Sequence, residues 1–272
     1  MHPFLFTIGS FKLPMYGLMI AAGYILALAY IFNRNRQAGL DKDNLSDLLF
    51  YILLMGIIGG KLFYVITYWG DFGSSFISRL GFVLKNFQYG FVFYGGFLLA
   101  LATFFFYTKK KKMPVIQTSE LIAAALPLAH AFGRIGCFFA GCCYGRPTDS
   151  IFGVIFDNAQ GEVPAALMGR PIHPVQLYEA FGNLVIFAVL NYLLARELKS
   201  GKLCGIVFCS YALMYGILRF SLEFFRGDDR GKGLISLSPA QTISVILIMA
   251  AAAGFFLVKR KNAARKDGES VL

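Results

Sequence analysis

The chain of 272 residues is 57% hydrophobic and only 15% charged, whereas soluble domains are about half apolar and about a quarter charged. This composition excludes an ordinary soluble domain and indicates a membrane protein. A net charge of +11 would suggest a nucleic-acid partner in a soluble protein, but no nucleic-acid-binding motif accompanies it and we expect no such partner.

Seven hydrophobic segments are long enough to cross a bilayer, which takes about 20 mostly apolar residues. They cover approximately residues 15–33, 46–69, 90–107, 117–140, 174–195, 203–224 and 239–258. We expect no cleavable signal peptide, because no basic region precedes the first segment. The pattern predicts an all-α protein with seven transmembrane helices, folded as a single integral membrane domain over residues 1–272.

Lysine and arginine residues set the predicted orientation. They are more frequent after the first, third, fifth and seventh spans than on the opposite side of the membrane. The more basic side holds Arg34, Arg36, Lys42, Lys109–Lys112, Arg196, Lys199, Lys202 and the tail from Lys259. Because cytoplasmic loops are rich in these residues, we predict an external N-terminus, a cytoplasmic C-terminus, and external segments at about 70–89 and 141–173.

Polar residues within six of the spans fall at one predicted depth, the outer half of the bilayer. In chain order they are Tyr16, Lys61, Tyr94, Arg134, the group His173, Gln176 and Glu179, and the group Tyr215, Arg219 and Glu223. Ionisable residues inside a membrane are costly and usually face a cavity that has a function. We therefore predict a polar site near the outer surface.

In the first span, Tyr16 precedes a glycine at the outer interface, and Tyr94 precedes Gly95 and Gly96 at the start of the third. Tyrosine is enriched at membrane interfaces without any further role, so binding and anchoring both remain open for these two residues. Lys61 lies deeper in the second span and needs a partner, which favours a binding role.

The richest motif is GRIGCFFAGCCYGRP, residues 133–147. Arg134, Cys137 and Gly141 are spaced i, i+3, i+7 and are predicted to share a helix face. One interpretation is an anion site, in which Arg134 binds a phosphate with the help of backbone N–H groups at glycines such as Gly145. In the other, the glycines serve helix packing and Arg134 extends to the interface.

The three cysteines of this motif, Cys137, Cys142 and Cys143, have several open roles. They could be structural, act as redox or catalytic thiols, or bind zinc with His130 or His173 as a further ligand. An odd total of five cysteines does not indicate a disulfide framework.

The segment HPVQLYE, residues 173–179, opens the fifth span. His173 and Gln176 are predicted to share a helix face, with Glu179 one turn further on. His173 could act as a base or donate a hydrogen bond to a lipid head group. Alternatively, the group caps the helix and fixes the external segment.

The segment YGILRFSLEFFR, residues 215–226, closes the sixth span. Its spacing predicts a stripe of Tyr215, Arg219, Glu223 and Arg226, with an ion pair between Arg219 and Glu223. This pair could orient the guanidinium for a second phosphate contact or simply close the helix end.

Taken together, these motifs resemble the prolipoprotein diacylglyceryl transferase family over nearly the whole chain. MYGLM, GGKLFY, FYGG, GRIGCFFAGCCYGRP, HPVQLYE and YGILRFSLEFFR occur in the order and spacing of that family. The resemblance implies a multi-pass enzyme of the bacterial inner membrane. It would transfer the diacylglyceryl group of phosphatidylglycerol to the lipobox cysteine thiol of a prolipoprotein, forming a thioether and releasing glycerol phosphate.

The resemblance, with the polar residues above, implies the roles of the site residues. Predicted catalytic residues are Tyr94, Arg134, His173 and Arg219. Predicted substrate-binding residues are Tyr16, Lys61, Gly95, Gly96, Cys137, Cys142, Gly145, Gln176, Glu179, Tyr215, Glu223 and Arg226. No cofactor or metal is expected, and a monomer is expected to act on phosphatidylglycerol and the prolipoprotein signal peptide.

The chain departs from the usual pattern of the family at four positions. Tyr94 stands for a histidine, Cys137 for an asparagine, Cys142 for a glutamate and Lys61 for an arginine. These departures indicate a divergent branch and leave the general base open between Tyr94 and His173. They also keep two alternatives open: the same fold and lipid donor with a different acceptor, or a lipid-binding membrane protein without catalysis.

Overall fold

The computed structural model describes residues 3–8, 11–86, 90–157, 161–201, 203–228 and 237–269. Lys202 and parts of the two predicted external segments, residues 87–89 and 158–160, lie outside the described residues. Within the described ranges, six helical segments are long and apolar enough to cross a membrane. The chain is therefore a helical, multi-pass membrane protein.

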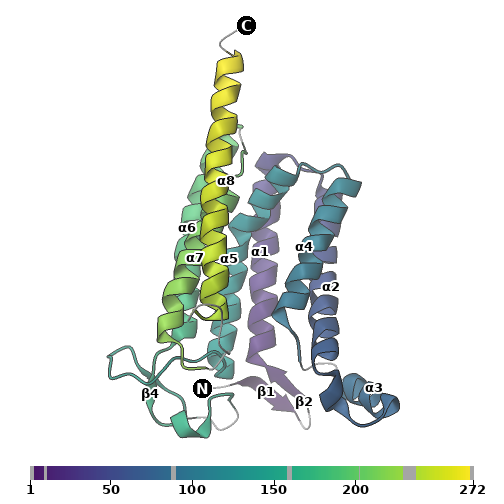
Figure 1. Cartoon of the computed structure of the whole chain (residues 1–272), viewed down its shortest axis with the longest axis vertical. Coiled ribbons are helices and arrows are strands. Elements are labelled where there is room, and N and C mark those ends of the chain that lie inside the picture. The colour runs from purple at the N-terminus through teal and green to yellow at the C-terminus, as the bar shows by residue number, and fades with distance from the viewer. Residues whose placement is uncertain are drawn as a thin grey trace. The chain divides into compact units, whose positions relative to one another are not determined.

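The chain divides into two compact units, which are described separately. The first comprises residues 1–38 and 119–272. Its spanning helices are α1 (Met15–Ala38), α5 (Val115–Ala140), α6 (Val175–Ser200), α7 (Ile206–Leu222) and α8 (Pro239–Glu269). Helix α7 packs against both α6 and α8 (Figure 1).

The second unit, residues 39–118, is built on two helices in close contact. Helix α2 (Lys42–Thr67) packs along α4 (Phe93–Lys110), and the short helix α3 (Phe76–Lys85) lies between them in the sequence. Helix α4 is not among the six spanning segments. It has 18 residues and includes Lys109 and Lys110 in its last turn, so a seventh span stays a prediction.

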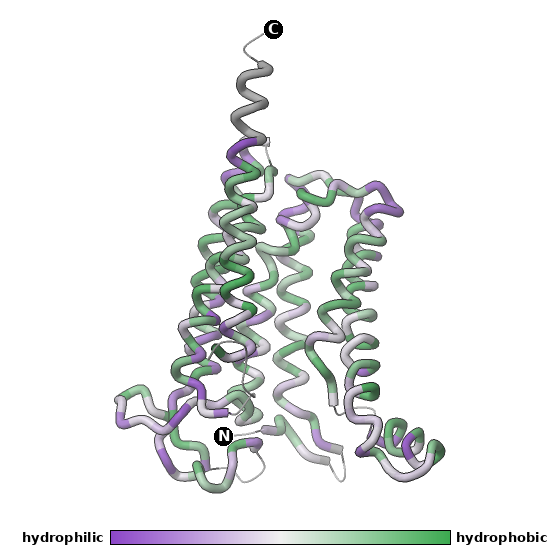
Figure 2. Tube along the Cα trace, viewed as in Figure 1, coloured by the Kyte–Doolittle hydropathy of each residue, from purple (hydrophilic) through white to green (hydrophobic). Residues whose placement is uncertain are grey.

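Hydrophobic residues dominate the middle of the helices (Figure 2). Many of their large side chains are exposed, for example Ile25 at 63%, Ile66 at 64% and Phe106 at 69%. In water such a surface would drive association, but lipid tails are as apolar as these side chains. By contrast, several charged and amide side chains are buried in the first unit, among them Glu120, Glu179 and Arg219.

Glu120 near the start of α5 holds the first turn of α7. Its Oε1 atom accepts hydrogen bonds from the backbone N–H groups of Gly205 at 2.7 Å and Val207 at 3.1 Å. The first N–H groups of a helix have no partner within the helix, and a carboxylate also interacts favourably with the positive end of the helix dipole. Glu120 therefore joins α5 and α7 through an N-terminal cap.

Most helices extend beyond the predicted spans, because the backbone continues as a helix until the sequence breaks it. Helix α1 runs to Ala38 before Gly39, whose φ is 71°. Helix α6 ends at Gly201, a left-handed C-cap with φ 66°. Glycine adopts this conformation without steric cost. The hydrophobic run therefore predicts only the membrane-spanning part of each helix. The residue at which α1 or α6 ends is set by the glycine that follows it.

The described residues are mostly helical, as the all-α prediction requires, but the prediction did not include two short antiparallel sheets and helix α3. Strands β1 (Phe4–Ile8) and β2 (Phe11–Pro14) lead into α1, while β3 (Val154–Ile155) pairs with β4 (Pro171–Ile172). Helix α3 lies within the predicted external segment 70–89. These pieces are too short for a clear hydrophobic period to predict them.

Candidate functional site

A buried ion pair joins α5 and α6 in the first unit. Arg134 Nε lies 3.1 Å from Oε2 of Glu179, whose side chain is only 1% exposed. His130, one turn before Arg134, places its Nε2 3.2 Å from Arg134 Nε and 3.5 Å from Glu179 Oε1. Glu179 thus fixes the guanidinium group, a positioning role that its predicted place in substrate binding did not anticipate.

Helix α7 contributes a tyrosine and a second ion pair to the first unit. The Tyr215 hydroxyl is hydrogen-bonded to the Arg134 guanidinium, and its ring centroid lies 5.2 Å from that of His130. Further along the helix, Arg219 Nη1 lies 2.8 Å from Glu223 Oε2, which confirms the predicted pair. Two guanidinium groups are therefore each held by a carboxylate at this end of the bundle.

The predicted stripe does not continue to Arg226, because α7 ends at Leu222 and a short 3-10 turn follows. Arg226 instead forms a two-pronged pair with Asp228, with Nε–Oδ1 at 2.8 Å and Nη2–Oδ2 at 2.6 Å. Burial alone would lower the pKa of Arg226, but Asp228 raises it above its ordinary value. Arg226 therefore keeps its charge although only 3% of its side chain is exposed.

Gly145 lies where three segments outside the spanning helices meet. Its N–H donates to the His173 carbonyl oxygen at 3.1 Å, and it forms an isolated bridge with Arg226. The neighbouring Gly227 N–H donates to the Tyr144 carbonyl oxygen at 3.2 Å. The backbones approach so closely that side chains would not fit, which explains the need for glycine at both positions.

The remaining predicted residues of the first unit lie at the same ends of their helices. Tyr16 begins α1, where its backbone packs against Gly136 of α5. Gln176, in the first turn of α6, donates from Nε2 to the Cys142 carbonyl oxygen at 2.7 Å. The side chain of His173 contacts Tyr178 at 3.3 Å and precedes α6, so it does not share a helix face with Gln176.

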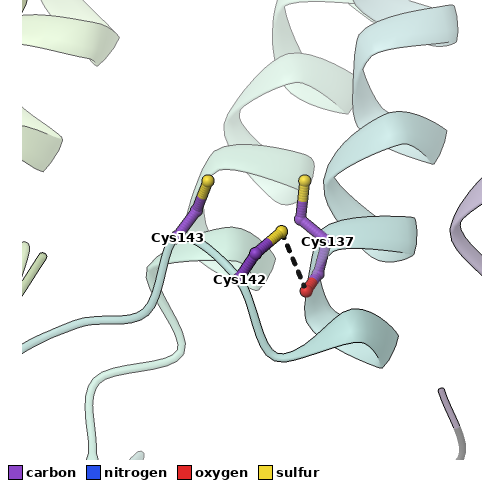
Figure 3. Close-up of side chains that lie close together, drawn as sticks. All are labelled: Cys137, Cys142 and Cys143. Carbon is purple, nitrogen blue, oxygen red and sulfur yellow. Dashed lines mark hydrogen bonds between the residues drawn. The ribbon is translucent and has the colours of Figure 1, made fainter. Parts of the chain in front are cut away.

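Cys137, Cys142 and Cys143 bring their three sulfur atoms within 4.8 Å of one another (Figure 3). Cys137 belongs to the last turn of α5, and Gly141 then reverses the chain with a φ of 78°. Gly141 therefore does not continue the helix face that the spacing predicted. Hydrogen bonds with Cys137 and Cys142 lower the pKa of the Cys143 thiol, and the charges of two arginines add to this effect.

In the second unit, Lys61 and the residues around Tyr94 lie at adjoining helix ends. Lys61 is 7% exposed and donates from Nζ to the Asn86 carbonyl oxygen at 3.2 Å. The Val92 N–H donates to the Gly60 carbonyl oxygen at 3.0 Å, while Tyr94 is 52% exposed. The predicted site residues are thus distributed over both units.

Gly95 and Gly96 lie against α2, where Gly59 and Gly56 face them. A Cβ atom on Gly95 would lie 2.5 Å from the Gly59 carbonyl oxygen and would collide with Phe63. We expect Gly95→Ala to lower the free energy of unfolding by about 1–3 kcal/mol through overpacking. Thermal unfolding of the purified protein measures this.

The matched control is Gly56→Ala on α2, because a Cβ atom there meets only the Gly96 carbonyl oxygen, at 4.0 Å. This variant should unfold at the original temperature or slightly above it, since alanine favours a helix over glycine. Equal unfolding temperatures for both variants would contradict the packing role of Gly95.

Comparison with known proteins identifies the family of the chain. The family model described as prolipoprotein diacylglyceryl transferase matches residues 3–257. The chain belongs to the prolipoprotein diacylglyceryl transferase family. This confirms the resemblance predicted from the six motifs.

Relatives named phosphatidylglycerol–prolipoprotein diacylglyceryl transferase are similar over almost their full length. The protein of Clostridium tetani (strain Massachusetts / E88) is 37% identical over 250 residues, covering 92% of this chain and 94% of its own. A second, numbered 2, from Clostridium perfringens (strain 13 / Type A) is 34% identical, with 88% of each chain covered. That of Rickettsia africae (strain ESF-5) is 33% identical, with 96% of this chain and 97% of its own covered.

Two residues of the candidate site were missed by sequence reasoning. His130 was considered only as a zinc ligand, although its spacing of four from Arg134 indicated a shared helix face. Asp228 follows Arg226 by two residues in an irregular segment, where no periodic pattern applies. The pairing of Arg134 with Glu179 joins two helices and had no local signal.

Proposed function

We propose that the chain transfers the diacylglyceryl group of phosphatidylglycerol to the lipobox cysteine of prolipoproteins. The observation that carries this proposal is the pair of guanidinium groups of Arg134, which is partly buried, and Arg219, which is buried, each oriented by a carboxylate within the first unit. Family membership over residues 3–257 supports it, as do the names of the relatives.

The leaving group of this reaction is a phosphate monoester, whose charge develops as the carbon–oxygen bond breaks. Fixed positive groups aimed at such a charge stabilise the transition state without reorganising. The contacts of Arg134 with Glu179 and His130 both use Nε, and Tyr215 is a further partner of the guanidinium group. A guanidinium group has five N–H donors, so it can also bind phosphate oxygens. Arg219 is proposed to make a second contact.

The other predicted residues have supporting roles in this proposal. In the first unit, Tyr16 and Tyr215 line the lipid site. In the second unit, Lys61 and Tyr94 keep the binding and catalytic roles that the family resemblance implies. Tyr94 or His173 takes the proton of the acceptor thiol. Cys137, Cys142, Gln176 and Arg226 contact the substrates, whereas Gly95, Gly96 and Gly145 allow close backbone approach, and Glu179 and Glu223 hold the arginines.

The proposal includes the finer topology. The chain is a monomer with seven spans in one integral membrane domain of the bacterial inner membrane, α4 being the third span. Its N-terminus is external and its C-terminus cytoplasmic. The excess of basic residues in the C-terminal turns of α1, α4, α6 and α8, and directly after the first three of these helices, supports this orientation.

The test is an assay of the full chain with phosphatidylglycerol and a peptide that carries a lipobox cysteine. Mass spectrometry should detect the peptide with one added diacylglyceryl group, and the same peptide with serine for cysteine should stay unmodified. Intact lipid binding without an adduct would contradict the proposal and favour a lipid-binding protein. Release of glycerol phosphate without peptide modification would favour another acceptor.

A further inference from the structure

Three thiols lie together beside the candidate phosphate site, and no step above uses them as a group. The Sγ atoms of Cys137, Cys142 and Cys143 all lie within 4.8 Å of one another. Tetrahedral zinc with zinc–sulfur bonds of about 2.3 Å requires sulfur separations of roughly 3.8 Å. Small side-chain rotations are enough to close the difference.

The backbone holds these thiols in an arrangement that has a conformational cost. Cys143 has a φ of 59°, which is uncommon for a residue with a side chain. Such a conformation costs on the order of 1–3 kcal/mol and persists only where the surroundings impose it. Here Gly141 turns the chain, and Gln176 fixes the Cys142 carbonyl oxygen at 2.7 Å.

The surroundings of the thiols suit a site with negative charge. Three thiolates around a divalent ion carry a net charge of −1. The guanidinium groups of Arg134 and Arg226 both act electrostatically on Cys143, and Arg226 is also hydrogen-bonded to it. Two cations next to an anionic metal centre offset its charge.

No histidine completes the cluster within the described residues. His130 contacts Arg134 and Glu179, and His173 contacts Tyr178, so neither supplies the fourth ligand considered for a zinc site. Structural zinc sites have four protein ligands, whereas catalytic sites have three and keep one position open. Among the described residues the group of potential ligands contains these three thiols alone, which corresponds to the catalytic type.

We propose that Cys137, Cys142 and Cys143 bind one zinc-type divalent ion, whose open fourth position takes the acceptor cysteine thiol. This inference rests on the proposed function, because it assigns the acceptor its place in that reaction. It also replaces our expectation of a site without metal.

The chemistry balances with the metal as a Lewis acid and no change of oxidation state. On coordination the acceptor thiol gives its proton to the general base of the proposed function, since a thiol bound to such an ion is deprotonated outright. Its sulfur then forms a bond to the terminal glyceryl carbon of the lipid, and the bond from that carbon to the phosphate oxygen breaks. Glycerol phosphate leaves with the electron pair, next to Arg134.

A disulfide is an alternative explanation of the cysteine cluster, but it would involve only two of the three thiols. None of the five cysteines forms a disulfide in this structure. A metal ion engages all three sulfur atoms and accounts for their convergence on one point.

The test uses the full chain purified in detergent under reducing conditions. Zinc content is measured after dialysis, and cobalt replaces zinc to give a thiolate-to-cobalt charge-transfer absorption. We expect about one zinc ion per chain and a background level in Cys137→Ser, Cys142→Ser and Cys143→Ser. Cys204→Ser and Cys209→Ser are matched controls outside the cluster and should keep the wild-type content.

A second arm tests the open position. Adding the lipobox peptide to the cobalt-loaded protein should change the charge-transfer absorption, and the peptide with serine for cysteine should leave it unchanged. Zinc content no higher than in the cluster variants, a disulfide among the three cysteines, or an absorption that ignores the peptide would overturn the inference.

Lipid transfer is measured separately, so that the two proposals fail differently. Full turnover after zinc removal by a chelator would overturn the metal site and leave the proposed function intact. Stoichiometric zinc and a peptide-dependent spectrum without any diacylglyceryl adduct would uphold the metal site and overturn the proposed function.

Discussion

Arg134→Gln is expected to lower turnover by about 10²–10³-fold, as the loss of one fixed donor to a developing anion does. The substitution also leaves Glu179 buried beside His130 without its main partner. Breaking a buried pair in this way destabilises proteins by roughly 3–5 kcal/mol. Turnover with phosphatidylglycerol and a lipobox peptide, together with thermal unfolding, measures both effects.

The double variant Arg134→Gln with Glu179→Gln separates catalysis from folding. Removing both charges takes away the unpaired carboxylate, so the unfolding temperature should return toward that of the wild type. Turnover should remain low, because the phosphate contact is still missing. If the double variant recovered turnover along with stability, Arg134 would have only a structural role.

Gly145→Ala should have the next largest effect. The new Cβ atom would lie 2.6 Å from His173 Cβ and 2.8 Å from Val175 Cγ2, and it would collide with the His173 carbonyl oxygen. Overpacking of this kind costs about 1–3 kcal/mol in unfolding free energy. Because Gly145 also pairs with Arg226, we expect turnover to fall by about 10²-fold, as for a site displaced by about 1 Å.

Gly133→Ala is the matched control from the same motif. A Cβ atom at this position in α5 meets nothing within 4 Å, and alanine should stabilise the helix by about 0.5–1 kcal/mol. Its turnover should match that of the wild type. A loss of activity in Gly133→Ala equal to that in Gly145→Ala would show that the motif needs flexible glycine throughout, not one close crossing.

Hydrophobic runs and local spacing predicted the parts of this protein that depend on neighbours in sequence. The six apolar helices follow from segment length and composition, and the Arg219–Glu223 pair follows from a spacing of four.

The contacts between distant segments could not be predicted in the same way. Glu179 binds Arg134 across two helices, and Gly145 meets His173 and Gly227 in irregular backbone. The helical and strand periodicities of a sequence relate only residues that are close in the chain, so they do not predict these long-range contacts. The sequence left a shared zinc site of the three cysteines as one possibility among several. It could not show that their sulfur atoms converge, because this depends on the left-handed turn at Gly141 and Cys143.

Helix α5 has consequences for the order in which the protein is made. Its Glu120 caps α7 at Val207, 87 residues further along the chain, and its Arg134 pairs with Glu179 on α6. At synthesis rates of about 5–20 residues per second, Val207 is synthesised roughly 4–17 s after Glu120. Until α6 and α7 follow, α5 carries two unmatched charges, so its stable insertion into the bilayer depends on later segments of the nascent chain.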